Sequence, residues 1–176
     1  KTKLCLLILL IVGLSVQLSA NPINGLLERI DKGASKKFVI EFKKGADDFF
    51  ELDQKGTKVV VRGNNYVNIA TGINWYLKYY AGIQLSWNGM QAKLPQVLPP
   101  VSRKERHETS LSLRYDFNYC TYSYTMAFWD WERWEKEIDW MALHGINLPL
   151  AAVGQECIWF NMLQKLGYSK DEINRF

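Results

Sequence analysis

The sequence predicts an α/β protein in two parts, a small α+β domain followed by alternating strands and helices. Three observations predict this class. Apolar and polar residues alternate in short segments near the start, and apolar residues then recur at helical spacing over 66–80. A proline-containing stretch follows at 94–106. After it, the order strand, helix, strand, helix over 110–166 is that of a (β/α) barrel or of an open α/β sheet.

The composition is that of a chain that folds around a core. Its 176 residues are enough for one or two domains, and 48% of them are hydrophobic and 14% aromatic. Such a chain buries apolar surface and does not resemble a disordered one. The net charge of +4 is small, and no basic run is dense enough to indicate nucleic-acid binding. Composition alone therefore points to no particular partner.

The first twenty residues have the pattern of a secretory signal peptide. Lys1 and Lys3 precede an apolar run over 4–16, and small residues at 19–20 precede a plausible cleavage site. A transmembrane anchor, the alternative, needs about 20 apolar residues, and this run is shorter. The chain also contains no Asn-x-Ser/Thr glycosylation site. We therefore predict an exported protein, periplasmic or secreted and of bacterial type, with no stable membrane anchor once residues 1–20 are removed.

The elements predicted for residues 21–101 form a sheet with one helix packed on it. A short amphipathic helix over 24–31 has Leu26, Leu27 and Ile30 on one side. Strands are expected at 36–43, 49–52 and 58–62, the main helix at 66–80, and a closing strand at 83–87 before a turn at Asn88-Gly89. The stretch over 94–106 is then a connector, because proline has no amide proton and restricts the residue before it. We place the domain boundary near Ser102, which gives domains at 21–101 and 102–176.

The second domain begins with an alternating strand at 110–118, and a loop over 119–129 follows it. Asp130 can cap a helix over 131–144 that Gly145 ends. Its apolar face would consist of Trp131, Trp134, Ile138 and Met141, and Glu132 and Lys136 would pair on the other face. The near-continuous apolar run at 146–153 is typical of a strand covered on both faces, and a helix at 156–166 follows.

Polar residues stand where the two predicted strands end. In barrels and open α/β sheets, ligands bind at the carboxyl ends of strands. These ends carry Asn118 and Cys120 after one strand, and Gln155 and Glu156 after the other. We therefore expect the four side chains to face one pocket.

Each of these residues also has a plain structural interpretation. Glu156 could bind sugar hydroxyls or transfer protons, but a carboxylate at a helix N-terminus is also stabilised by the helix dipole. Gln155 suits hydroxyl recognition but is common in turns, and Asn118 could equally cap a turn. Cys120 has no histidine partner in the motifs, so a pocket-lining or core thiol is favoured over a nucleophile. The aromatic residues at 119–134 could stack on sugars or pack in the core. No metal-ligand spacing, phosphate loop or nucleophile elbow is present, so no metal or cofactor is expected.

Several segments closely resemble the α-N-acetylglucosaminidase family of glycoside hydrolases. They are Asn118-Tyr119-Cys120-Thr121, the segments at 129–135, 137–143 and 145–148, Gly154-Gln155-Glu156 and Ile158-Trp159. Residues 76–82, Ser86-Trp87, Leu166-Gly167 and 172–174 are similar to the same family, so the resemblance covers nearly all of the chain after residue 20. Ala152-Val153 departs from the family's pattern and affects the detailed shape of the pocket.

The resemblance implies a small α/β domain, then a TIM (β/α)₈ barrel and a helical domain. It implies retaining hydrolysis of terminal α-linked N-acetylglucosamine in glycans, with Asn118 and Cys120 lining the sugar subsite and Gln155 and Glu156 beside the sugar. The family's two catalytic glutamates lie on later barrel strands, so the resemblance places no catalytic residue before Phe176.

A barrel of this kind takes about 250 residues, whereas residues 102–176 would supply its first two β/α units only. We therefore expect a truncated, N-terminal fragment of an exported glycosidase, inactive by itself. The alternative is a complete, non-catalytic carbohydrate-binding protein, which the aromatic segment 119–129 suggests.

Overall fold

The structure is a computed structural model that describes residues 21–151 and 154–175. The signal peptide predicted for residues 1–20 and the departure at Ala152-Val153 lie outside the described residues. None of the described helices is long and apolar enough to cross a membrane.

The small domain is built on a four-stranded sheet with the order β1-β3-β2-β4. Strand β1 runs parallel to β3, whereas β2 is antiparallel to both β3 and β4. The strands are β1 (Phe38–Phe42), β2 (Asp48–Lys55), β3 (Lys58–Gly63) and β4 (Glu105–Thr109). The predictions of the first three strands are confirmed.

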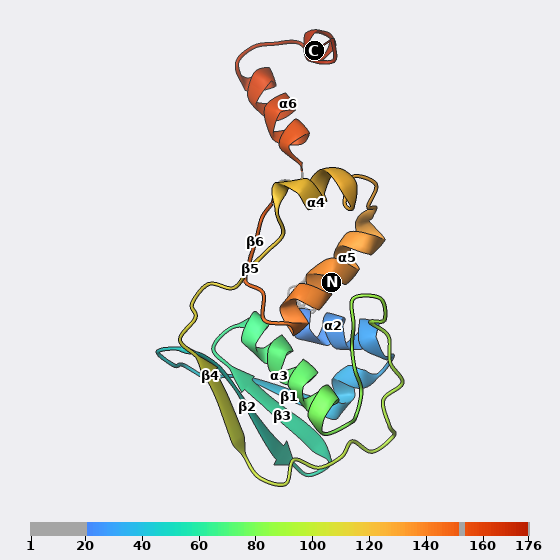
Figure 1. The fold of residues 1–176 in the computed structure, drawn as a ribbon, viewed down its shortest axis with the longest axis vertical. Coiled ribbons are helices and arrows are strands. Elements are labelled where there is room, and N and C mark those ends of the chain that lie inside the picture. The colour runs from blue at the N-terminus through green and yellow to red at the C-terminus, as the bar shows by residue number, and fades with distance from the viewer. Residues whose placement is uncertain (1–20, 152–153, 176) are drawn as a thin grey trace, which may run out of the picture.

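Two helices, α2 (Pro22–Ile30) and α3 (Tyr66–Tyr79), cover one face of this sheet, and a 3₁₀ turn, η1 (Ala34–Lys37), precedes β1 (Figure 1). Both predicted helices are confirmed. Asn21 and Asn65 begin them by accepting hydrogen bonds from backbone amides of the first turn. Between helices and sheet lies one apolar core, to which α2 contributes Ile23, Leu26, Leu27 and Ile30.

Helix α3 approaches the sheet very closely at Gly72. A Cβ at this position would lie 2.9 Å from the Val61 side chain and 3.1 Å from that of Phe50. Glycine is therefore required here by space, although it lowers helix propensity.

The closing strand predicted at 83–87 is wrong. The chain there is irregular, and Ser86 makes only an isolated bridge to Gly89, which closes the predicted turn. Leu85 is nevertheless fully buried, so the apolar alternation reports burial and not strand pairing. The fourth strand is instead β4, which begins at the end of the predicted connector (94–106) and stops before the strand predicted at 110–118.

Strand β4 has the charged sequence ERHET and lies at the edge of the sheet beside β2. Charged residues are common on edge strands, where they discourage pairing with other chains. The domain boundary near Ser102 stays a prediction, and β4, which follows it, belongs to the sheet of the small domain.

The second part has the predicted order of strand, helix, strand and helix. Strands β5 (Tyr115–Asp116) and β6 (Leu148–Pro149) are parallel neighbours, and α5 (Trp131–Leu143) lies between them in sequence. Both strands are shorter than the predicted 110–118 and 146–153. Asp130 caps α5 by accepting a hydrogen bond from the Arg133 amide at 2.9 Å. The predicted Glu132–Lys136 pair is present at 2.8 Å.

The loop predicted over 119–129 is wrong at its start, where α4 (Tyr119–Tyr124) forms a helix. Asn118 and Thr121 form a reciprocal capping box at its N-terminus. This short helix lacks the apolar periodicity that marks longer ones, which is why the sequence did not indicate it.

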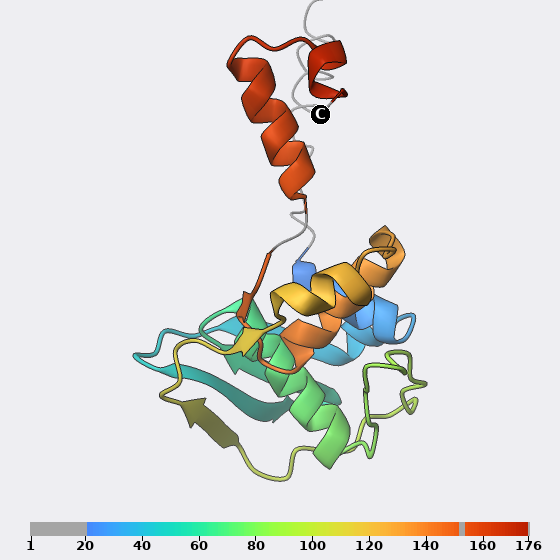
Figure 2. The ribbon, with the colours of Figure 1, turned by 45° about the horizontal axis from the view of Figure 1, so that its top comes forward.

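Helix α6 (Gln155–Lys165), predicted at 156–166, is confirmed, and α7 (Lys170–Ile173) follows it. Both helices extend away from the rest of the molecule (Figures 1 and 2) and have no buried residue. The expectation that the strand before α6 is covered on both faces is not met. Both residues of β6 are exposed, because β5 is its one strand neighbour in the described part of the chain and a cavity lies between β6 and α5.

Candidate functional site

The carboxyl ends of β5 and β6 form one edge, because these strands are parallel neighbours. Tyr115 pairs with Leu148, and Asp116 pairs with Pro149. Two residues separate the end of β5 from the start of α4, and α6 follows β6, so both helices start beyond this edge (Figures 1 and 2). We call it the β5–β6 edge. In α/β folds such edges carry the ligands.

Asn118, at this edge, uses its side-chain oxygen to cap α4. The oxygen accepts hydrogen bonds from the amides of Cys120 at 2.9 Å and Thr121 at 3.0 Å. The capping role that the sequence left open is therefore present. The Nδ2 amide of the same side chain donates to none of the described residues, and it is exposed to solvent with the rest of the residue.

Cys120 is an exposed, free thiol. A cysteine nucleophile would need a base within hydrogen-bonding distance. His144 Nδ1 instead lies 2.8 Å from the Trp140 carbonyl oxygen, and His107 belongs to the distant β4. Within the described residues the thiol thus has no histidine partner that would make it a nucleophile.

Gln155 and Glu156 are the first two residues of α6, and both are exposed. Gly154 precedes them with a left-handed φ of 81° and provides no side-chain cap. The Glu156 carboxylate is therefore well placed to interact with the unpaired amides of the first helical turn. The four predicted site residues thus follow neighbouring strands, but none of them lines the cavities described below. Their role in sugar binding stays a prediction.

Arg114 holds the start of β5 against the small domain. Its guanidinium donates to the Asp48 carboxylate at 2.8 Å, to the Leu111 carbonyl at 2.6 Å and to the Gly145 carbonyl. Burial by itself would raise the pKa of Asp48, but hydrogen bonds from Arg114 and Asn68 outweigh burial and lower it. Asp48 is therefore a fixed anion that orients Arg114, and not a proton donor.

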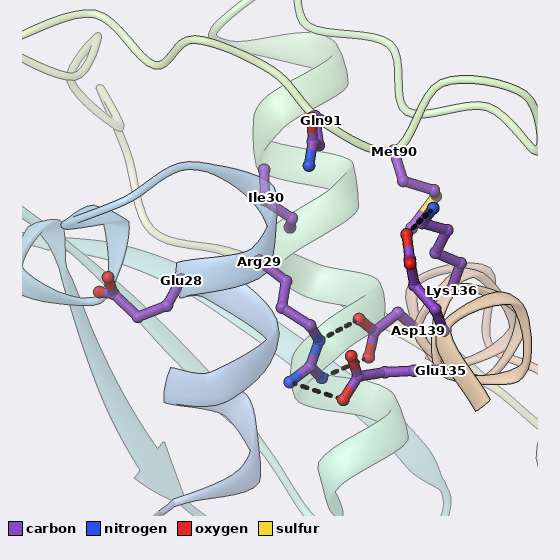
Figure 3. Close-up of a pocket in the computed structure, with 9 residues that line it drawn as sticks. Glu28, Arg29, Ile30, Met90, Gln91, Glu135, Lys136 and Asp139 are labelled. Atoms are coloured by element: carbon purple, nitrogen blue, oxygen red, sulfur yellow. Dashed lines mark hydrogen bonds and ion pairs between the residues drawn. The ribbon is translucent and has the colours of Figure 1, made fainter.

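A cavity of about 300 Å³ lies between α2 and α5, lined by charged residues from both helices (Figure 3). Arg29 reaches across and donates to both carboxylate oxygens of Asp139, at 2.6 and 2.7 Å. Glu135 lies 3.6 Å from the same guanidinium. Hydrogen bonding to Asp139 raises the pKa of Arg29. Because these charged groups pair with one another, they form a contact between the small domain and the second part of the chain. The cavity beside them is therefore not a good candidate for a ligand site.

Helix α3 also contacts the second part of the chain, at the end of α5. The Asn74 side-chain amide donates to the Leu143 carbonyl at 3.1 Å. The Thr71 hydroxyl donates to the Val67 carbonyl of its own helix at 2.8 Å and lies 3.4 Å from the Ala142 carbonyl. Both carbonyls belong to the last turn of α5. That of Ala142 also accepts from the Gly145 amide at 3.3 Å, and that of Leu143 has Asn74 as its donor.

A second cavity of about 280 Å³ lies between α5 and β6 and is almost entirely apolar. Its lining includes the whole predicted apolar face of α5, namely Trp131, Trp134, Ile138 and Met141, together with Phe117 and residues 149–151. Met141 is buried, but Trp131 is 69% exposed and Ile138 is 46% exposed. The residues that α5 buries instead include Glu137 and Asp139.

Sequence reasoning missed the polar contacts that join the two parts. Glu137 is 2% exposed and accepts hydrogen bonds from Arg133 and from Trp87. Its spacing of four from Arg133 was a usable signal. The Arg29–Asp139 and Arg114–Asp48 pairs join residues far apart in sequence, and no local pattern indicates them. Within 21–151 and 154–175, no group of three or more His, Cys, Asp or Glu residues is placed to hold a metal ion.

Two protein-family models match the chain. The model of the α-N-acetylglucosaminidase N-terminal domain matches residues 21–100, and that of the α-N-acetylglucosaminidase TIM-barrel domain matches residues 114–176. Among curated proteins, α-N-acetylglucosaminidase of Homo sapiens is 42% identical over 146 residues, which are 83% of this chain and 20% of the human protein.

The fold is similar to that of solved structures of a family 89 glycoside hydrolase from Clostridium perfringens. One is a complex with PUGNAc, and another is a variant with two glutamates replaced by glutamine, in complex with its substrate GlcNAc-α-1,4-galactose. Each is 38% identical with a TM-score of 0.80, and the match covers 89% of this chain and 18% of that one. The chain thus spans about a fifth of the length of the relatives it matches.

Proposed function

We propose, because the chain belongs to the α-N-acetylglucosaminidase family of glycoside hydrolases, that it forms the small domain and the first part of the barrel of a glycosidase. The enzyme would release terminal α-linked N-acetylglucosamine from glycans. One structural observation supports the proposed sugar site. The parallel neighbours β5 and β6 present Asn118 and Cys120, and then Gln155 and Glu156, beyond the same edge.

These four residues offer the contacts that an N-acetylated sugar requires. The Asn118 Nδ2 amide can donate to a hydroxyl or to the acetamido carbonyl, and the Gln155 amide can both donate and accept. The Glu156 carboxylate can accept from two neighbouring hydroxyls, and such charge-assisted hydrogen bonds are the stronger kind. The Cys120 thiol would line the pocket without reacting. The glycan is the only partner that we propose.

The reaction we propose is hydrolysis with retention of the anomeric configuration. Retention needs an acid/base and a nucleophilic carboxyl group about 5–5.5 Å apart, and Glu156 cannot act as both. We infer that both catalytic carboxylates come from later strands of the barrel, of which residues 102–176 provide two β/α units. The 176-residue chain assayed alone should therefore be inactive.

Export is a further part of the proposal, with the pattern of residues 1–20 as its support. A protein isolated from the periplasm or the medium should begin at Asn21. Recovery of the protein in the cytoplasm with residues 1–20 intact would contradict export.

The test of the proposed activity uses the product of the whole gene. We expect it to release the aryl group from an aryl α-N-acetylglucosaminide and not from the β-anomer. NMR of the first product should show the α-anomer of the free sugar. Inertness of the whole product towards the α-linked substrate would refute the proposed activity, and a β-anomeric product would refute retention alone.

A second candidate function is non-catalytic carbohydrate binding. The exposed aromatic residues of the segment 119–129 favour it, since Tyr119 is 77% exposed, Tyr124 82% and Phe128 94%. Aromatic faces of this kind can stack on sugar rings. Calorimetric titration of the 176-residue chain with an oligosaccharide ending in N-acetylglucosamine separates the two candidates. Binding by the chain, together with inertness of the whole gene product, would favour this second function.

A further inference from the structure

The segment that carries Asn118 and Cys120 is held at both ends by one tryptophan of α5. At its start, the ring of Phe117 meets that of Trp134 edge to face, with centroids 6.5 Å apart. At its other end, the ring of Trp129 meets the same Trp134 with centroids 4.9 Å apart. Trp134 therefore links both ends of the segment 117–129 to a rigid helix.

The start of this segment is strained. Phe117 has a φ of 72°, and it is the only residue other than glycine with positive φ in the described part of the chain. A bulky residue in this region is strained and persists only where its surroundings hold it. Asp116 accepts a hydrogen bond from the Phe117 amide at 2.7 Å. Because Asn118 comes next, this held turn sets the direction in which Asn118 leaves β5.

The end of the segment is held by the small domain as well. The guanidinium of Arg133 lies over the rings of both Trp129 and Trp87, 3.9 and 4.7 Å from their centroids. Trp87 belongs to the tight turn Ser86–Gly89 of the small domain. Its indole N–H donates to Glu137 at 2.7 Å, and Arg133 donates to the same carboxylate oxygen at 2.8 Å. We call these residues, Trp87, Trp129, Arg133 and Glu137, the tryptophan–arginine stack.

Glu137 fixes the geometry of this stack. A buried carboxylate is costly unless charged or polar groups satisfy it, and Glu137 receives both donors on one oxygen. The donors fix the orientation of the Trp87 ring and of the Arg133 guanidinium, and the guanidinium in turn presents a flat cation to Trp129. The tryptophan–arginine stack therefore fixes the position of the Trp129 ring as well as burying apolar area.

We propose that Trp87, from the small domain, is a positioning residue for sugar binding at the β5–β6 edge. It acts through Arg133 and Trp129, which fix the segment that presents Asn118 and Cys120. The inference rests on the proposed function. It assigns the small domain a part in substrate binding. A ligand pocket loses affinity when the groups that line it are not already fixed in the binding geometry before the ligand arrives.

The test compares three variants of the whole gene product. Trp87→Leu removes the stack and the N–H donor, Trp87→Phe keeps a ring but loses the donor, and Phe42→Leu is the control. Phe42 is an aromatic residue of the same domain with similar exposure that packs on Tyr66. We expect Trp87→Leu to raise KM about tenfold with little change in kcat. Trp87→Phe should have an intermediate effect, and the control should keep the KM of the unmodified protein.

A second measurement does not depend on catalysis. A spin label on Cys120 of the whole gene product reports the mobility of the segment directly. The background carries Cys5→Ser, Cys157→Ser and serine in place of any cysteine encoded after residue 176. Its mobility should rise in Trp87→Leu and, to a smaller extent, in Trp87→Phe, and should stay unchanged in the control.

The two measurements together separate the possible failures. Unchanged label mobility in Trp87→Leu would overturn the inference whatever happens to KM, and raised mobility with unchanged KM would overturn the link to sugar binding. If the unmodified protein is inert, the proposed function fails, and label mobility alone then decides whether Trp87 holds the segment.

Discussion

The two parts of the molecule use similar apolar patterns and bury them to very different extents. In the small domain, Leu27, Leu52 and Leu77 have no exposed surface. In the second part, Ile158 is 68% exposed and Leu166 is 67% exposed, although both follow a helical spacing. The difference teaches that periodicity identifies a helix and its apolar face, whereas burial depends on whether another element covers that face. In a complete barrel, neighbouring units cover each strand and helix.

The largest expected effect comes from deleting matched side chains in the two parts. Leu77→Ala in the core should lower the free energy of unfolding by about 2–5 kcal/mol, because a cavity is left in a fully packed site. Ile158→Ala, on exposed α6, should change it by no more than about 0.5 kcal/mol. Urea unfolding of the chain from residue 21 measures both. Equal losses in the two variants would show that α6 is covered in solution, and the comparison would then be wrong.

A smaller loss of stability is expected at the contact between α2 of the small domain and α5 of the second part. Arg29→Ala removes a two-pronged ion pair with Asp139, whose side chain is 12% exposed. We expect a loss of about 1–3 kcal/mol, which is typical of hydrogen bonds to charged groups. Asp139→Asn and the double variant complete a mutant cycle. Hydrogen exchange should show faster opening of α5 with little change in β1 to β3. Additive effects of the two substitutions would mean that the pair does not couple the parts.

The smallest expected effect is a pH-dependent change in stability. It compares a buried carboxylate of the small domain, Glu51, with an exposed one of the second part, Glu156. Burial alone would raise the pKa of Glu51, but hydrogen bonds from Lys43, Lys104 and Arg106 lower it from 4.5 to about 2. A lowered pKa stabilises the folded state above the unfolded value. This stability is therefore fully present above about pH 4.5 and is lost as the pH falls towards 2.

Glu51→Gln should be less stable than the unmodified chain at pH 7, and the difference should shrink as the pH falls through this range. Glu156→Gln is the control, because its exposed carboxylate makes no ion pair with the described residues. Thermal melts at pH 7, 4 and 3 measure the effect. A stability gap between Glu51→Gln and the unmodified chain that is constant over this range would contradict the assignment.

Local signals in the sequence were sufficient for the elements that begin and end with clear caps. Helix α5 starts at Asp130 and is followed by Gly145, and both features are visible in the chain. Strand β4 could not be recognised, because its charged residues form a strand only by pairing with β2, about fifty positions earlier. The polar residues of the β5–β6 edge could be located from strand order alone. The tryptophan–arginine stack could not, since Trp87 and Glu137 are 50 residues apart.

The contact of α3 with the last turn of α5 has a consequence for how the protein is made. Asn74 donates to the Leu143 carbonyl at the C-terminus of α5. This donor leaves the ribosome about seventy residues before the carbonyl that needs it. We therefore expect the small domain to fold first on the nascent chain and to serve as the template on which α5 ends at the correct residue. A stalled ribosome that exposes residues up to about 110 should already carry a protease-resistant small domain.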